Sequence, residues 1–270
     1  MKIKVRYLTV FFSALAIASI IFWGCSEQPA VNETLDSSGR PTISDAERAL
    51  AMLEVQNAFS KHAFYHINGN HCEEMDDIWV KEGGAYDETA HWGEQEGITV
   101  IKRAYCIDNI ETKKKALTAI SKVSDVKDVP ENLGAGHEFS LHMQTTPIIE
   151  VAGDGKTAKG VWYTPGFIKR PDIKDGKIRV TGQWMFERYA VDFAKEDGKW
   201  KIWHFQNLGD TSPPWGANDQ TGQALFGDAA NQAQTQADAG TPKVWSPTTV
   251  PEMYPKLPEP YYTFSETFSY

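Results

Sequence analysis

Histidine and tyrosine side chains that could move a proton are spread along this 270-residue chain, and His142 is the most informative of them. It lies in a predicted strand, Phe139–Val151, where alternation places His142, Gln144 and Thr146 on one face. An imidazole in an apolar cavity, with its other nitrogen fixed by a hydroxyl or amide, could take a proton beside a carbonyl and return it to a leaving hydroxyl. The alternative is a hydrogen-bonded histidine of the core. His142 is therefore predicted to be either a general base or a structural residue.

Other side chains could complete such a site. Tyr86 could polarise a carbonyl oxygen with its phenol, and Asp87 or His91 is an alternative acid–base group. His204, in the last predicted strand, could reach a ligand, and Trp162 could line an aromatic cavity suited to a flat, apolar ligand. Each also has a plainer reading, because an edge-strand tyrosine, a loop or surface histidine and a core tryptophan need no function.

A pair of histidines in the first predicted helix raises the question of a metal. His62 and His66 stand four residues apart and so share a helix face. Three further candidate ligands follow just after that helix: His71, Cys72 and Glu73. Such donors could bind zinc in tetrahedral geometry, but no second motif at a defined spacing accompanies the pair. We therefore expect no metal and no cofactor, with Tyr65 or His66 at the mouth of the cavity and the other histidines in solvent.

Three helices are predicted to come first in the globular part of the chain. Ser44-Asp45-Ala46-Glu47 is a plausible N-cap with a carboxylate at the third helical position, and apolar residues then recur at helical spacing. This helix should end near Asn68-Gly69. A second helix is predicted over His71–Val80 and a third over Ile98–Ile107.

Four strands are predicted to follow as a meander. Asp-Gly turns within Gly153–Lys156 and Glu196–Lys199, flanked by β-branched and aromatic residues, are strong hairpin signals. Lys169–Gly176 is predicted to be a loop over the opening, either a lid or a subunit contact. Helices packed into the concavity of a curved meander predict an α+β cone.

With three helices followed by a four-strand meander, the chain resembles the SnoaL-like branch of the nuclear-transport-factor-2-like superfamily over about residues 44–215. The resemblance rests on four short motifs: Ser140-Leu141-His142-Met143 leading to Thr146-Pro147, Gly160-Val161-Trp162-Tyr163, Asp197-Gly198-Lys199-Trp200-Lys201-Ile202, and Pro213-Pro214-Trp215-Gly216. It is nearest to the bile-acid and scytalone dehydratases, which eliminate water from a hydroxylated cyclic substrate. It implies a cone-shaped α+β barrel with a curved, mostly antiparallel sheet around the N-terminal helices.

The resemblance also implies roles for particular positions. His142 falls on the pocket histidine of those dehydratases, and Asn68 falls where they carry an acid at the end of the first helix. Tyr65 lies close to the position of their aromatic hydroxyl, and Asn207 is expected to donate a hydrogen bond where the last strand closes the site. Two further polar positions of the family carry glycine here: Gly166 and Gly209.

The N-terminus is typical of an export signal. A basic start is followed by an apolar run, Tyr7–Trp23, and then by Gly24-Cys25-Ser26. We expect a lipoprotein-type signal peptide over 1–24, lipidation of Cys25, a polar tether over 25–43, the SnoaL-like domain over 44–216 and an extended C-terminal tail over 217–270. The alternative is an uncleaved anchor. Either way, we expect the body of the protein at a membrane surface of the cell envelope, outside the cytoplasm.

Charge and cysteine content exclude some classes of function. Lys and Arg number 27 against 36 Asp and Glu, a net charge of −9, and removal of the three basic residues of the signal leaves 24 against 36, or −12. This balance argues against nucleic acid as a partner and against electrostatic docking on anionic lipid. Three cysteines are too few for a disulfide framework. Cys72 and Cys106 are therefore predicted to be buried thiols, although an oxidising compartment would permit them to pair.

Two functions remain from the sequence. The first is a cofactor-independent lyase or isomerase on a hydrophobic cyclic carbonyl or hydroxy compound, with His142 as base and Tyr86, Tyr65 or Asn68 placing the oxygen. The second is a non-catalytic lipoprotein that binds an apolar small molecule. Because the fold often buries a sheet face between subunits, a homo-oligomer is also expected.

Overall fold

The computed structural model describes residues 34–89, 93–211 and 253–270 of the chain. Cys25 and His91 lie outside these residues, as do the predicted signal and most of the predicted tether. The residues from Thr34 to Tyr270 belong to one compact unit. Within the described ranges, no helix is both long and apolar enough to span a membrane.

The first helix, α1 (Asp45–Asn68), begins and ends where the sequence predicted. The Ser44 hydroxyl accepts from the Glu47 amide while the Glu47 carboxylate accepts from the Ser44 amide, which completes a capping box. Gly69 ends the helix in the left-handed conformation, with φ of 69°. The buried face of α1 carries four side chains: Ala51, Val55, Phe59 and His62.

The second predicted helix is shorter and the third is longer than the sequence indicated. Helix α2 (His71–Asp77) stops before Val80, because residues 78–80 exchange backbone hydrogen bonds with Ile202 instead. Helix α3 (Ile98–Lys102) continues through a π-helical turn (Arg103–Asp108) into α4 (Asn109–Ser121). Helix α4 buries only Leu117 and Ile120, so its apolar periodicity is too weak to predict it from the sequence.

Seven strands form one curved sheet on which the helices pack. Their order is β4-β3-β9-β8-β7-β5, and β6 also pairs with β7. The strands are β3 (Tyr86–Thr89), β4 (Gly93–Glu96), β5 (Phe139–His142), β6 (Thr145–Val151), β7 (Thr157–Lys174), β8 (Lys177–Glu196) and β9 (Lys199–Thr211). All pairs are antiparallel except β3 with β9. A separate short ribbon pairs β1 (Thr34–Leu35) with β2 (Pro41–Thr42), and short 3-10 turns lie at Pro130–Gly136 and Phe264–Glu266.

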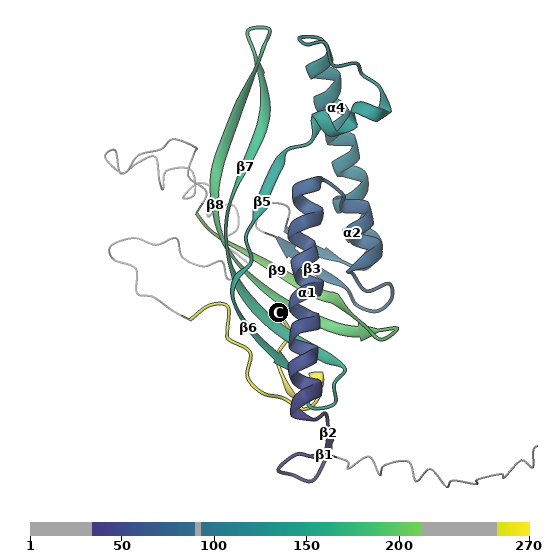
Figure 1. Cartoon of the computed structure of the whole chain (residues 1–270), viewed down its shortest axis with the longest axis vertical. Helices are drawn as coiled ribbons and strands as arrows, with labels where there is room; N and C mark the ends of the chain where they lie inside the picture. The colour runs from purple at the N-terminus through teal and green to yellow at the C-terminus, as the bar shows by residue number, and fades with distance from the viewer. Residues whose placement is uncertain (1–33, 90–92, 212–252) are drawn as a thin grey trace, which may run out of the picture. The chain divides into compact units, whose positions relative to one another are not determined.

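The meander differs from the prediction in two places. The predicted strand 139–151 is broken at Met143 and Gln144, where Thr146 adopts a positive φ of 47° and the register on β7 shifts. The predicted loop over 169–176 is wrong, because β7 and β8 continue in register to Lys174 and Lys177. Asp175 and Gly176, with φ of 55° and 65°, make the tight turn that two-residue hairpins favour. The long β7–β8 hairpin projects past the rest of the sheet (Figure 1).

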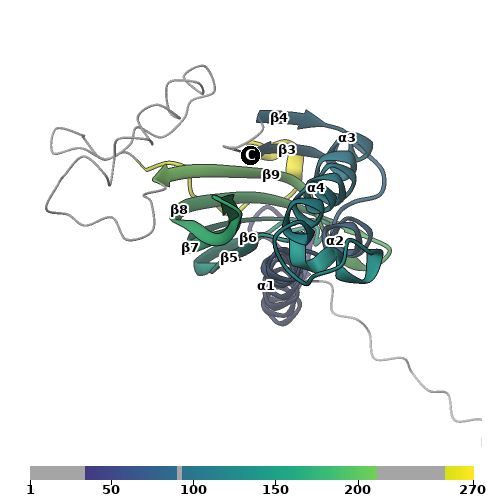
Figure 2. The same cartoon turned by 90° about the horizontal axis from the view of Figure 1, so that it is seen from above.

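The helices cover one face of the sheet, and α1 runs across it (Figures 1 and 2). The core lies between them. The Phe59 ring of α1 packs 4.3 Å from the Trp162 ring of β7 and 5.9 Å from the Phe193 ring of β8, measured between centroids. The result is the α+β cone that the sequence predicted.

The described part of the C-terminal tail, residues 253–270, packs on its own domain at the opposite face of the sheet. Lys159 and Asp192, both fully buried, form an ion pair beneath it. The Lys159 ammonium also donates to the Phe268 carbonyl at 2.6 Å, and the Tyr270 amide donates to the Asp192 carboxylate at 3.0 Å.

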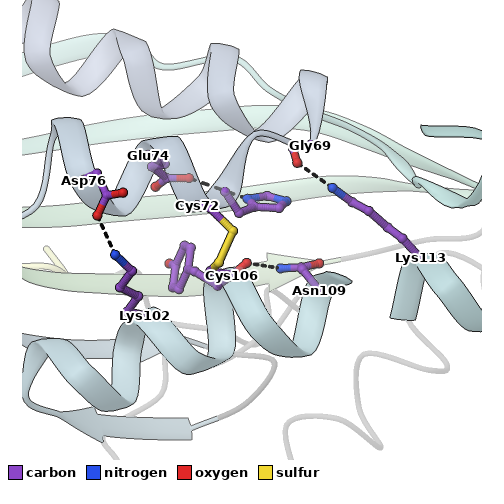
Figure 3. The surroundings of a disulfide bond; sticks show 10 residues. Gly69, Cys72, Glu74, Asp76, Lys102, Cys106, Asn109 and Lys113 are labelled. Atoms are coloured by element: carbon purple, nitrogen blue, oxygen red, sulfur yellow. Dashed lines mark hydrogen bonds and ion pairs between the residues drawn. A yellow bond between two sulfur atoms is a disulfide. The ribbon is translucent and has the colours of Figure 1, made fainter. Parts of the chain in front are cut away.

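The two cysteines predicted to be thiols are instead joined in a disulfide. Cys72 of α2 and Cys106 of the π-helical turn pair with their Cα atoms 4.6 Å apart (Figure 3). Sequence spacing could not place them within bridging distance, since the pairing depends on how α2 packs against a turn thirty-four residues further on. The bond clips α2 to the helical layer beside the sheet.

Candidate active site

A cavity of about 480 Å³ lies between the helices and the sheet. Its walls come from α1, α2, the π-helical turn and α4 on one side and from β5, β7, β8 and β9 on the other. Six of its polar lining residues matter for chemistry: His66, His71, Tyr105, His142, Tyr189 and Asn207. Its size is within the range of small-molecule sites.

Both ring nitrogens of His142 make hydrogen bonds inside this cavity wall. Nε2 lies 2.7 Å from the Ser140 hydroxyl, and Nδ1 lies 2.7 Å from the Tyr189 hydroxyl. The Tyr189 hydroxyl donates its proton to Glu187 at 2.9 Å, so its oxygen must accept from Nδ1–H. The network therefore assigns the Nδ1-protonated tautomer and leaves the Nε2 lone pair facing Ser140.

A carboxylate stands behind this imidazole. Oε2 of Glu187 lies 3.3 Å from Nδ1 of His142, and the Glu187 side chain is only 1% exposed. Burial and the Glu187 carboxylate raise the pKa of Tyr189 well above its usual range, so the phenol stays protonated. The arrangement can stabilise positive charge on His142 without taking up a proton elsewhere.

A second cluster adjoins the first and gathers three histidines around Glu74. Oε1 of Glu74 lies 2.7 Å from Nδ1 of His62 and 3.4 Å from the donating Trp79 indole nitrogen. Oε2 of Glu74 lies 3.2 Å from Nε2 of His66 and 3.6 Å from Nδ1 of His71. Figure 3 shows Glu74 beside the disulfide, on the helix that carries Cys72.

Burial and neighbouring side chains together set the charges of this second cluster. Burial alone would raise the pKa of Glu74, but the neighbouring His66 and His62 outweigh burial and hold that pKa well below its usual range. Burial, with His62 close by, lowers the pKa of His66 well below its ordinary value. The cluster thus holds an ionised carboxylate beside a neutral imidazole. The two clusters meet where the rings of His66 and His142 lie 5.5 Å apart.

The disulfide positions one wall of the cavity. His71 precedes Cys72 on α2, and Tyr105 precedes Cys106 in the π-helical turn, so the bond links the segments that carry both lining residues. Burial raises the pKa of Tyr105 well above its usual range, and its hydrogen bond to the Asp87 carboxylate adds to this effect.

Five of the residues singled out from the sequence line the cavity: His62, His66, His71, His142 and Asn207. Asn207 is 7% exposed, and its side-chain oxygen has no hydrogen-bond partner among the residues that the structure describes. The expectation that the other histidines of the first helices would be solvated is wrong, since His62 is 1% and His71 is 6% exposed. Both face Glu74, which the sequence did not single out.

Other selected residues do not line the cavity. The Tyr65 hydroxyl donates to Asp77 at 2.9 Å, and the exposed Asn68 amide donates to its own helix at the Phe64 carbonyl. Trp162 is a core residue whose indole donates to Gln56, and Tyr86 is only partly buried at the start of β3. His204 sits on the opposite face, between Asp192 and the Gly84 carbonyl.

Gly166, where the resemblance led us to expect a polar side chain, has a structural reason to be glycine. It pairs with His142 across β5 and β7, and a Cβ there would collide with the Leu141 carbonyl. No acid or histidine fits at this position while β5 lies so close.

Sequence reasoning missed Ser140, Glu187 and Tyr189, although signals for them were present. Ser140 shares the face of His142 by simple alternation. Alternate residues of a strand share one face, so Glu187 and Tyr189 lie on the same face of β8 as Val191 and Phe193. Val191 and Phe193 are fully buried. A glutamate on the inward face of a strand is a rare choice that points to a partner.

Comparisons with known proteins agree with this architecture. The family model for the SnoaL-like domain matches residues 47–206. No curated protein sequence matches the chain.

Solved structures with a similar arrangement include three with low identity. A candidate scytalone dehydratase from Novosphingobium aromaticivorans is 12% identical, with 65% of this chain and 94% of that chain covered and a TM-score of 0.45. The hexachlorocyclohexane dehydrochlorinase LinA-type3 from Novosphingobium barchaimii is 12% identical, with 65% and 97% covered and a TM-score of 0.43. A candidate dehydratase of the NTF2-like family from Streptomyces avermitilis is 13% identical, with 59% and 96% covered and a TM-score of 0.41.

At these TM-scores the structural neighbours carry no argument about function. The family model, in contrast, covers more than half of the chain, and the helices and curved sheet described above lie within the span that it matches, apart from the start of α1 and the end of β9. The chain therefore belongs to the SnoaL-like domain family and has its NTF2-like α+β fold.

Proposed function

We propose that this protein is a lyase or isomerase that transfers a proton on a small hydrophobic cyclic compound bearing a carbonyl or hydroxyl group. One observation carries the proposal. Buried His142, in the cavity wall, has an Nε2 lone pair that accepts from the Ser140 hydroxyl, and the Glu187 carboxylate lies beside its other nitrogen, Nδ1. A base of this kind contributes a factor of about 10²–10⁴ in rate.

The chemistry follows from the hydrogen-bond network. Nε2 of His142 takes a proton from the carbon beside the carbonyl, and the imidazolium so formed is stabilised by Glu187. The same proton then returns to the leaving hydroxyl, the carbon–oxygen bond breaks, a carbon–carbon double bond forms and water departs. Return of the proton to another carbon gives isomerisation instead. In the absence of substrate the Ser140 hydroxyl donates a hydrogen bond to Nε2. This hydrogen bond breaks when the substrate carbon approaches Nε2.

The rest of the cavity suits such a substrate. Ile168, Met185 and Phe205 provide an apolar wall, and the Asn207 side-chain oxygen could accept a hydrogen bond from a substrate hydroxyl. A mostly apolar lining with a few polar groups that orient the ligand is typical of small-molecule sites.

The test uses the full chain and its His142→Gln variant with a panel of hydroxylated steroidal, aromatic and terpenoid ketones. Mass spectrometry would follow loss of water and uptake of deuterium from solvent. We expect conversion of at least one compound by the parent and a drop of at least a hundredfold in the variant. A matched control is Tyr163→Phe, at a side chain 58% exposed on β7. Equal turnover by His142→Gln and the parent would end this proposal.

A second candidate is a non-catalytic small-molecule-binding protein. This candidate is favoured because both ring nitrogens of His142 already make hydrogen bonds within the protein, to Ser140 and to Tyr189. Retention of a panel compound without chemical change, with the same affinity in the parent and in His142→Gln, would support it.

We further propose that the protein is exported and held at the cell envelope by a lipid on Cys25. The basic start and apolar run ahead of that cysteine support this. Cys25→Ser should move the protein from the membrane fraction to the soluble fraction, and an unchanged distribution would contradict lipid anchoring.

We also propose a homo-oligomer. Large side chains left partly exposed along the projecting hairpin and its neighbour support it: Phe139, Trp184 and Phe186, each between 39% and 42% exposed. Light scattering on the full chain in detergent, with the micelle mass subtracted, would decide it, and a monomer at micromolar concentration would refute it.

A further inference from the structure

The cluster around Glu74 contains buried polar atoms that make no hydrogen bond within the described part of the chain. Among those residues, Oε2 of Glu74, Nε2 of His66 and Nδ1 of His71 all lack a hydrogen-bond partner, although Glu74 is fully buried. Leaving such an atom unsatisfied costs about 1–3 kcal/mol. Three together at one point call for a bound group that all of them can contact.

The distances between these atoms match those of a metal site. In tetrahedral zinc sites the bonds to nitrogen and oxygen are about 2.0–2.1 Å, which places neighbouring ligand atoms about 3.3 Å apart. Nε2 of His66 and Oε2 of Glu74 are 3.2 Å apart, and Nδ1 of His71 lies 3.6 Å from the same oxygen. The ligand atoms of His62, His66 and Glu74 all lie within 4.8 Å of one another.

Two helices present the donors as matched pairs. His62 and His66 are four residues apart on α1, and His71 and Glu74 are three residues apart on α2, so each pair shares a helix face. The Cys72–Cys106 disulfide fixes α2 between the two donors that it carries. It also removes Cys72 from the possible ligands.

From this geometry we propose that His62, His66 and Glu74 bind one divalent transition-metal ion of the zinc type, with His71 beside the fourth coordination position. Two imidazoles and a carboxylate are typical zinc ligands, whereas magnesium and calcium prefer oxygen alone. All three histidines also line the cavity, so the ion is placed at its wall. The inference goes beyond the proposed function and does not rest on it.

Calorimetry on the full chain tests this directly. The protein, purified in detergent without a polyhistidine tag and stripped with EDTA, is titrated with zinc chloride. We expect one ion per chain and a dissociation constant in the micromolar range or below. Glu74→Gln and His66→Asn should each weaken binding at least tenfold. The control is Glu73→Gln, which changes an exposed carboxylate on the same helix and should bind zinc as the parent does.

Cobalt provides a second readout that does not depend on enzyme activity. Co²⁺ bound in place of zinc should give the visible absorption of a four-coordinate site, and this signal should disappear in His66→Asn. Circular dichroism establishes that each variant is folded. Where Glu74→Gln proves unfolded, His66→Asn decides the question. Absence of saturable binding by the folded parent, or equal binding by the folded Glu74 or His66 variants, overturns the proposal.

Discussion

Oε2 of Glu187 lies 3.3 Å from Nδ1 of His142, although β7 separates their strands in the sheet. The resemblance seen in the sequence led us to expect an acid at the end of the first helix, where this chain has Asn68. Here a carboxylate instead reaches the imidazole from strand β8 of the same sheet. An acid partner for His142 is therefore present, but at a different place in the fold.

Glu187→Gln should lower turnover while leaving substrate affinity unchanged. Glutamine keeps the size of the side chain but cannot stabilise the imidazolium, and Glu187 is not among the residues that line the cavity. We expect kcat to fall on the order of 10- to 100-fold and KM to stay unaltered. Such a fall does not exceed the rate factor that a general base itself contributes. Steady-state kinetics on a turned-over panel compound measure both. Glu150→Gln on β6 is the matched control, and a rise in KM alone would contradict the assignment.

Tyr189→Phe should destabilise the fold. The hydroxyl bridges His142 and Glu187, and its removal leaves two buried groups each short of a partner. We expect the free energy of unfolding to drop by about 2 kcal/mol. Urea unfolding followed by fluorescence measures it. Tyr163→Phe, at an exposed hydroxyl, should stay within about 0.5 kcal/mol of the parent. Equal stabilities for the two variants would show that the bridge is unimportant.

The folded protein should lose stability as the pH drops below 6.5. The folded-state pKa of His66 is depressed, so below its ordinary value of 6.5 the unfolded chain takes up a proton that the folded chain does not. A second loss should begin below pH 4.5, since the pKa of Glu74 is also lowered. Both contributions are fully present at higher pH and disappear as the medium becomes acidic.

His66→Asn isolates the first of these losses. Between pH 6.5 and 5 the variant should show a shallower slope, by up to about 1.4 kcal/mol per pH unit. Urea unfolding in EDTA at several pH values measures the slopes without interference from bound metal. Parallel curves for the variant and the parent would mean that His66 titrates alike in the folded and unfolded chain.

Much of the scaffold was predictable because local sequence determines it. The capping box at Ser44 and the Asp-Gly turns are signals carried by a few adjacent residues, and they fixed the start of α1 and the ends of the hairpins. The failures are non-local. The break at Gln144 depends on how β5 and β6 share β7, and the extra length of the third helix rests on only two buried residues of α4.

The candidate site was only partly predictable for the same reason. His142 was found by strand alternation and by resemblance, since both depend on its immediate neighbours. Glu187 was missed because its contact with His142 crosses an intervening strand. Glu74 was missed because it matters only through the packing of α2 against α1, which brings it to His62 and His66.

Removing the disulfide should cost about 3–4 kcal/mol of unfolding free energy. Cys72 and Cys106 close a loop with a sequence separation of 34, and that range follows from the chain entropy which such a loop gains when opened. The double variant Cys72→Ala/Cys106→Ala, compared with the parent in urea, measures it. A reducing agent should shift the parent by a similar amount and leave the double variant unmoved. Coincident curves for parent and variant would exclude the bond as a source of stability.

That single bond also makes the structure of the cavity wall depend on the redox conditions of the compartment. It joins the helix that carries His71 and Glu74 to the turn that carries Tyr105, so one wall is complete only after two thiols have been oxidised. Reducing compartments keep such thiols apart, whereas exported proteins meet oxidants as they fold. A chain held in a reducing compartment would thus have its helices and sheet but no covalent link across this wall of the cavity, and that link would form only where the redox conditions allow.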